Sequence, residues 1–224
     1  SDLAPWPDSP DKWSTHSMLF NLRINPLRGY SARGTIWYQG ESDSYDGFSE
    51  KFEGLINEWR SVFISPNMPF LFVQLPSYKG WKWELSRAEQ ESIAKKRSNV
   101  FMICSIDTGE ENDVHPHDKV EIGKRLAKAA FAKSGKIFPS LRGVDYRGDS
   151  ATVKFKYKKG LECRGNCRGF EILSGGKWIA ADGKFEGRKV MLKSPDGSNI
   201  DGVRYLWKPW AKPDVCLFDS DGNP

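Results

Sequence analysis

A short apolar run in this chain leads directly into polar residues that could stabilise the transition state of an ester cleavage. The β-branched and aromatic stretch Thr35–Tyr38 is followed by Gln39, Gly40 and Glu41. The Gln39 amide offers a donor for a developing oxyanion, an interaction that commonly contributes about 3 kcal/mol in acyl transfer. Gly40 leaves room for a substrate and for a close backbone approach. We therefore predict Gln39 as an oxyanion donor and Gly40 and Glu41 as substrate-binding residues, with the alternative that Gln39 and Glu41 only satisfy backbone groups of their loop.

A second polar group, further along the chain, could act as a general base. His115 precedes Pro116, which disfavours a helical backbone at the histidine. A neutral imidazole is the usual proton acceptor for a serine hydroxyl, and it needs an acid to hold its tautomer. Asp113 is the first candidate, because alternate side chains of an extended segment share a face. Asp107 is the other candidate for this acid, and the sequence leaves the choice open. His115 could instead simply face solvent, and His117 has less support as the base.

The regular elements expected around these residues alternate between strands and helices. Strands with continuous hydrophobicity that alternate with amphipathic helices favour a parallel sheet covered on both faces. The carboxyl ends of such strands gather ligand sites, so the loop at Gln39 and the loop at 107–117 should lie at one edge of the sheet. The expected strands are Thr35–Tyr38, Pro69–Leu75 and Val100–Ile106, and the expected helices are Phe48–Phe63, Ser86–Lys96 and Val120–Phe131, the last with Leu126, Ala130 and Phe131 on its apolar face.

The pattern changes near residue 140. Ala151–Tyr157 alternates between apolar and polar residues, and further short runs of this kind are separated by turns rich in Gly, Asp and Ser. Such spacing is typical of an antiparallel β-domain. We therefore predict two domains, residues 1–140 and residues 141–224. The further strands expected in the second are Phe170–Leu173, Lys177–Ala181, Lys189–Leu192 and Val203–Trp207.

Composition narrows the class of protein. The chain has 224 residues, 38% of them hydrophobic and 28% charged, with a net charge of +5 that is dispersed along the sequence. We expect no nucleic-acid partner, because a clustered basic stripe and a recognisable binding module are missing from the sequence. We also expect no membrane partner, since no apolar run approaches the roughly 20 residues that cross a bilayer. Glu41 and Asp43 could be read as a glycosidase pair, but they lie on one loop, which disfavours that reading.

The four cysteines allow more than one interpretation. Cys163 and Cys167 could close a small disulfide loop, as in exported proteins, or could remain free thiols. A zinc site is the least favoured reading, because the other cysteines, Cys104 and Cys216, are distant in sequence. Cys104 lies in an apolar run and is most simply a small buried residue.

Several motifs together resemble the carboxyl-terminal portion of the sialate O-acetylesterase family, within the SGNH/GDSL hydrolase superfamily. They keep order and spacing, and the match runs from about residue 15 to the end. The motifs are Asn21–Leu27, Gly34–Ser42, Asn57–Arg60, Pro69–Leu75 and Asp113–Pro116, followed by Lys119, Gly123–Ala127 and Val203–Trp207.

The resemblance implies a partial flavodoxin-like, three-layer α/β/α esterase domain that removes acetyl groups from sialic acids without metal or organic cofactor. It implies that His115 is the catalytic histidine and that Gln39 lines the oxyanion hole. It also implies a secreted, periplasmic or lysosomal protein. Family chains carry the nucleophilic serine upstream in a Gly-Gln-Ser-Asn block, which this sequence lacks.

The missing block leads to the hypothesis of a two-part enzyme. An upstream segment or a second chain would supply the serine, and the present chain alone would be inactive. Two other functions stay open: acetyl removal from plant polysaccharide, and a non-catalytic carbohydrate-binding protein that uses Trp178, Trp207 and Trp210 as sugar platforms.

Overall fold

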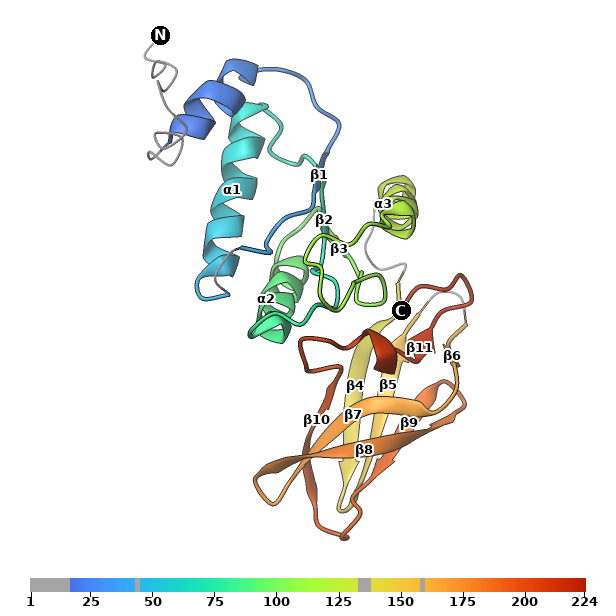
Figure 1. The fold of residues 1–224 in the computed structure, drawn as a ribbon. Helices are drawn as coiled ribbons and strands as arrows, with labels where there is room; N and C mark the ends of the chain where they lie inside the picture. Colours follow the sequence, from blue (N-terminus) through green and yellow to red (C-terminus); the bar gives the residue numbers. More distant parts are fainter. Residues whose placement is uncertain (1–16, 43–44, 133–137, 158–159) are drawn as a thin grey trace.

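The computed structural model describes residues 17–42, 45–132, 138–157 and 160–224. The first part of the chain is mixed α/β, as predicted, and the second part is rich in antiparallel strands (Figure 1). Residues 1–16 of the expected lead-in, residues 1–33, and Asp43 fall outside the described residues. No helix in these ranges is both long and apolar enough to span a bilayer.

Three strands form a parallel sheet in the order β1 (Thr35–Trp37), β2 (Phe70–Val73) and β3 (Val100–Ile103). All four residues of β2 are buried, which explains the unbroken apolar run in the sequence. The strands are shorter than predicted because the chain leaves the sheet at Tyr38, Gln74 and Cys104, where the loops of the polar edge begin.

Helices cover both faces of this sheet (Figure 1). On one face, α1 (Phe48–Val62) and α2 (Trp83–Lys96) pack against Phe70, Phe72 and Val100 through Phe48, Phe52, Ile56 and Ile93. On the other face, α3 (Val120–Ala132) packs against Leu71, Val73 and Ile103. Successive residues of β2 thus point alternately into the two cores, as expected for a strand that is buried on both faces.

The predicted apolar face of α3 is wrong in part. Leu126 is buried as expected, but Ala130 is exposed and Phe131 is 91% exposed. The buried positions are Ile122, Arg125, Leu126 and Ala129, which recur at helical spacing. The buried face of α3 therefore differs from the predicted one and includes an arginine. A prediction based on apolar residues alone leaves this arginine out.

The part after residue 138 contains a six-stranded antiparallel sheet in the order β10-β7-β8-β9-β5-β4 and a two-stranded pair, β11-β6. All five expected strand positions carry strands, whereas β4, β6 and β11 were not predicted. A domain boundary near residue 140 stays a prediction. The strands are β4 (Ser140–Arg147), β5 (Ser150–Lys156), β6 (Glu162–Cys163), β7 (Cys167–Ser174), β8 (Lys177–Glu186), β9 (Lys189–Lys193), β10 (Ile200–Tyr205) and β11 (Leu217–Phe218).

The segment after β10 holds the two parts together. The buried guanidinium of Arg87, on α2, donates hydrogen bonds to the carbonyl oxygens of Leu206 (3.4 Å), Lys208 (2.5 Å) and Pro209 (3.2 Å). Burial lowers the pKa of Arg87 to about 10, so the side chain is still a cation at neutral pH. Ile106, at the polar edge of the sheet, packs with Leu206 beside this contact.

Candidate active site

The loop after β1 is held close to the helices by Gly40. This residue is buried and has φ +139°, a conformation that side-chain-bearing residues rarely adopt. A Cβ at this position would lie 3.3 Å from Nε2 of Gln90 and 3.6 Å from the Phe48 ring. Glycine therefore allows the loop to pass close to α1 and α2, and it fixes the backbone between Gln39 and Glu41.

Gln39 has a free carboxamide at this edge. The side chain is half-buried, and it makes no hydrogen bond with any residue in the described ranges. Glu41 is also half-buried. A carboxamide with no partner in the described part of the chain has its N–H groups available to donate to a developing oxyanion.

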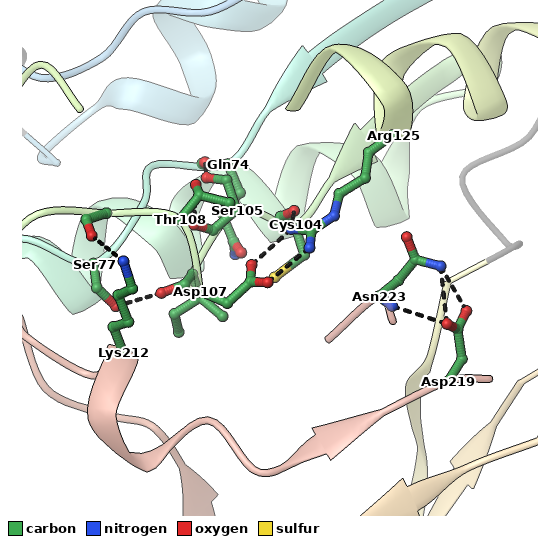
Figure 2. A network of polar contacts seen from close by, with 12 residues as sticks. Gln74, Ser77, Cys104, Ser105, Asp107, Thr108, Arg125, Lys212, Asp219 and Asn223 are labelled. Carbon is green, nitrogen blue, oxygen red and sulfur yellow. Dashed lines mark hydrogen bonds and ion pairs between the residues drawn. The ribbon is translucent and has the colours of Figure 1, made fainter. Parts of the chain in front are cut away.

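Asp107 forms an ion pair with Arg125, and its role as the acid for His115 stays a prediction. Both of its oxygens accept hydrogen bonds from Arg125 of α3, at 2.6 Å and 2.7 Å, and the Arg125 side chain is only 4% exposed (Figure 2). Arg125 also donates to the carbonyl oxygen of Cys104 at 2.9 Å. Burial alone would lower the pKa of Arg125, but the Asp107 carboxylate outweighs it and raises that pKa. Asp107 thus serves to bind α3 to the end of β3, a use that the sequence prediction of an acid for His115 did not foresee.

Asp113 and His115 do meet, but through the backbone. The N–H of His115 donates to Oδ1 of Asp113 at 2.8 Å, which closes the side-chain turn that aspartate favours. His115 is exposed, and its ring has no hydrogen-bond partner in the described part of the chain. Contact between the Asp113 carboxylate and the His115 ring stays a prediction.

The imidazole that does contact carboxylates is that of His117. Its Nδ1 lies 3.1 Å from Oε1 of Glu110 and 3.9 Å from Oδ2 of Asp113. Its backbone N–H donates to the same Glu110 oxygen at 2.8 Å, and these hydrogen bonds lower the pKa of Glu110. The side chain of His117 is 80% exposed. Glu110 was missed by sequence reasoning, although its spacing to His117 in a turn was available as a signal. The three side chains offer one oxygen or nitrogen ligand each within 4.8 Å, but as exposed groups already hydrogen-bonded together they give no reason to assign a metal.

The loops after β1 and β3 are fastened to each other. Lys119 Nζ lies 3.5 Å from the phenolic oxygen of Tyr38 and 4.6 Å from the centre of its ring. Tyr38 directly precedes Gln39, and Lys119 follows His115 by four positions. The predicted convergence of these two loops is therefore supported by a direct contact between them, although the Gln39–His115 geometry itself stays a prediction.

The segment after β10 buttresses the loop that carries the histidines. Ser77, after β2, donates to the carbonyl oxygen of Ile106 at 2.6 Å and accepts from the N–H of Ala211 at 3.3 Å. Lys212 donates to the carbonyl oxygen of Gly109 at 2.8 Å. Figure 2 shows Ser77 and Lys212 together with the Asp107–Arg125 pair. A Cβ on Gly109 would overlap the carbonyl oxygen of Ser77, so the two loops approach each other only because Gly109 lacks a side chain.

The two buried serines at this edge, Ser77 and Ser105, have structural roles. Ser77 and Ser105 are fully buried. The Ser77 hydroxyl donates to Ile106 and that of Ser105 to the carbonyl oxygen of Gln74. Neither hydroxyl contacts an imidazole in the described part of the chain.

The sequence of this chain is similar to that of known carbohydrate esterases. A family model described as a carbohydrate esterase, sialic acid-specific acetylesterase, matches residues 8–132. The chain is 28% identical to the sialate O-acetylesterase of Rattus norvegicus, over 88% of the chain and 43% of that protein. It is 30% identical to the sialate O-acetylesterase of Homo sapiens, over 91% of the chain and 46% of that protein.

A solved structure of a carbohydrate esterase is also similar to this chain. The crystal structure of a carbohydrate acetylesterase from Xanthomonas citri superposes with a TM-score of 0.83 and 28% identity, over 92% of this chain and 52% of that one. The chain thus spans about half the length of the proteins that it matches.

Proposed function

The chain belongs to the sialic acid-specific acetylesterase family of carbohydrate esterases, a family of carboxylic ester hydrolases, and we propose that it carries the general base and an oxyanion donor of such an enzyme. The proposed reaction removes O-acetyl groups from sialic acids. The observation that carries the proposal is the Lys119–Tyr38 contact, because it joins the loop of His115 to the loop of Gln39.

The proposed mechanism uses a serine that lies outside this chain, on an upstream segment or a second chain. The serine hydroxyl attacks the acetyl carbonyl, and His115 takes its proton. Gln39 donates a hydrogen bond to the oxyanion that forms on the carbonyl oxygen. His115 then gives the proton to the departing sugar oxygen, which leaves an acetyl-serine. Water, deprotonated by His115, releases acetate and restores the hydroxyl, with Asp113 orienting the imidazole throughout.

The edge of the parallel sheet leaves room for such a missing part. Within the described ranges, β1 pairs with β2 and with no other strand. Ile36 of β1 is paired in register with Leu71, so both point to the face that α3 covers, yet Ile36 is 64% exposed. An edge strand with an exposed apolar residue is a surface on which a further strand can pair. We infer that the missing part adds a strand beside β1 and a helix over Ile36, which would complete the three-layer α/β/α architecture of an SGNH hydrolase.

The carbohydrate-binding alternative has less support. Trp178 is 41% exposed, but the guanidinium of Arg204 lies 4.3 Å from the centre of its ring and occupies one face. Trp207 and Trp210 are half-buried in the segment that Arg87 binds. Each of the three is therefore partly engaged with the protein, which leaves less ring surface for a sugar.

Reconstitution tests the esterase proposal. The chain is co-expressed with the polypeptide encoded upstream of it, and acetate release is measured from O-acetylated sialic acid and from acetylated xylan. We expect release from the sialic acid with both parts present and none with the present chain alone. Faster acetate release from acetylated xylan would instead identify plant polysaccharide as the substrate. Glycan binding that persists in His115→Ala, with no acetate release from any reconstituted form, would favour the binding protein.

Family membership also leads to a proposal for the localisation of the protein. We propose that the protein is secreted, periplasmic or lysosomal, because its substrates are sugars on exported glycans. Fractionation of the source cells with an antibody to the chain tests this, and recovery in the cytosolic fraction alone would contradict it.

A further inference from the structure

Three of the four cysteines meet in the strand-rich part of the chain. Cys163 ends β6, Cys167 begins β7, and Cys216 directly precedes β11. Their sulfur atoms all lie within 4.8 Å of one another, and all three are free thiols. Cys216 is distant from the other two in sequence, which made a zinc site the least favoured reading. The fold nevertheless brings it next to them.

The fold brings the thiols together through the strand pairing. Leu217 is paired in register with Cys163, so Cys216 lies next to β6. The phenolic oxygen of Tyr205 accepts hydrogen bonds from the N–H groups of Cys216 (3.1 Å) and Leu217 (3.4 Å). These two bonds fix the Cys216 backbone, and the same phenolic oxygen lies 3.5 Å from the Cys216 sulfur. The Cys216 thiol also lies 3.4 Å from the carbonyl oxygen of Arg168.

Gly183 makes room for Cys167. It is paired with Cys167 across the ladder, and a Cβ there would lie 3.3 Å from Sγ of Cys167. The register is irregular between Cys167 and Phe170, where Gly169 has φ +84°. The missing side chain at Gly183 thus leaves space beside the Cys167 thiol, next to a bulge in β7.

The spacing and chemistry of the three sulfurs fit a single metal ion. Thiolates bound at about 2.3 Å to one tetrahedral zinc ion lie roughly 3.8 Å apart, within the spread observed here. A set of three sulfur ligands selects a soft or borderline ion such as zinc over magnesium or calcium, which prefer oxygen. A disulfide, by contrast, would join only two of the three thiols.

A surface pocket borders two of the three thiols. It has a volume of about 570 Å³ and is lined by Cys163, Cys167 and Gly183, among others. A water molecule from this side would complete a tetrahedral site, since no carboxylate or imidazole in the described part of the chain joins the three sulfurs as a further ligand.

We propose that Cys163, Cys167 and Cys216 bind one zinc ion as thiolates. The ion would join β6, β7 and the segment before β11. It would thereby stabilise the end of the strand-rich part, where β6 and β11 are only two residues long. The site is separate from the polar edge of the parallel sheet, so the inference does not depend on the proposed esterase function.

Metal binding to the reduced, purified chain tests this inference. Cobalt(II) is added stepwise, and the charge-transfer absorption of cobalt thiolates is recorded. We expect the absorption to saturate at one equivalent and to disappear when zinc is added. A chain purified under reducing conditions without chelator should contain close to one zinc per molecule, and its removal should lower the melting temperature by roughly 5 °C or more.

Variants with serine in place of single cysteines distinguish metal binding at this site from non-specific binding to thiols. Cys216→Ser and Cys163→Ser should each abolish the cobalt absorption, whereas Cys104→Ser, which alters the remaining cysteine, should keep it. Circular dichroism shows whether each variant retains its strands, and the more exposed Cys163 provides the test if Cys216→Ser does not fold. No thiolate absorption with the reduced wild-type chain, or a native chain lighter by two hydrogens with a disulfide among these cysteines, would overturn the proposal.

Discussion

Lys119 and Tyr38 form the contact that joins the two loops of the candidate site. The ammonium group lies 3.5 Å from the phenolic oxygen and 4.6 Å from the ring centre, so it engages both the polar tip and the face of the tyrosine. Such a cation–π contact is worth about 0.5–1 kcal/mol at an exposed site. Its position matters more than its energy, because the loop of His115 is thereby held next to Gln39.

Tyr38 should titrate at unusually high pH. Burial, with a smaller contribution from the Glu41 carboxylate, raises its pKa from the ordinary 10.0 to about 12. Because the folded state keeps this proton longer than the unfolded state, the contribution of Tyr38 to stability is complete below pH 10 and is lost as the pH rises toward 12. We expect the difference between rapid alkaline titrations of wild type and Tyr38→Phe, followed by tyrosinate absorbance, to have its midpoint above pH 11. A midpoint near 10 would show that the phenol is not buried in this way.

The Asp107–Arg125 pair should be structural. Removing one member of a buried, hydrogen-bonded pair leaves an uncompensated charge and typically costs 3–5 kcal/mol, so Asp107→Asn or Arg125→Met should lower the free energy of unfolding by about that amount. The matched control is Lys124→Met, which removes the exposed pair between Lys124 and Glu121 on the same helix and should cost about 1 kcal/mol or less. Urea unfolding of the three variants measures this. Equal losses at the exposed and the buried pair would contradict the assignment.

Gly109 should tolerate no side chain. The Cβ of Gly109→Ala would overlap the Ser77 carbonyl, and because backbone cannot move aside like the tip of a side chain, we expect a loss of about 1–3 kcal/mol or more. Gly123→Ala is the control: nothing lies within 4 Å of a Cβ there, and alanine in the body of α3 should stabilise by up to about 1 kcal/mol. Thermal unfolding distinguishes the two, and opposite signs are expected. A neutral Gly109→Ala would mean that the two loops can separate at no cost.

Local sequence patterns predicted the helices and strands well, but they did not predict the contacts between these elements. The helix at Phe48–Val62 and the strand at Phe70–Val73 follow from periodicity over a few residues, and both are where they were expected. The use of Asp107 depends on Arg125, which is 18 positions away on a helix face that counting apolar residues did not find. No local pattern carries that information, because the burial of an arginine is decided by a partner from another element.

The same limit explains the cysteines and the short strands. Cys216 reaches Cys163 only because β11 pairs with β6, and two-residue strands have no periodicity to detect. β4 was missed because most of its residues are exposed, so it lacks the alternation that revealed β5.

The choice of histidine can be decided by two matched pairs of variants in the reconstituted enzyme. His115→Ala should lower kcat/KM for acetate release by about 10²–10⁴, the usual contribution of a general base. His117→Ala should lower it by less than about tenfold, since it removes exposed hydrogen bonds worth about 1 kcal/mol. Asp113→Asn should lower kcat strongly if this carboxylate orients the His115 ring in the complete enzyme, whereas Glu110→Gln, which loosens only His117, should not. The reverse result, with His117 and Glu110 essential and His115 dispensable, would assign the base to the imidazole that already contacts a carboxylate. It would show that the Asp113 contact to the His115 backbone only shapes the turn.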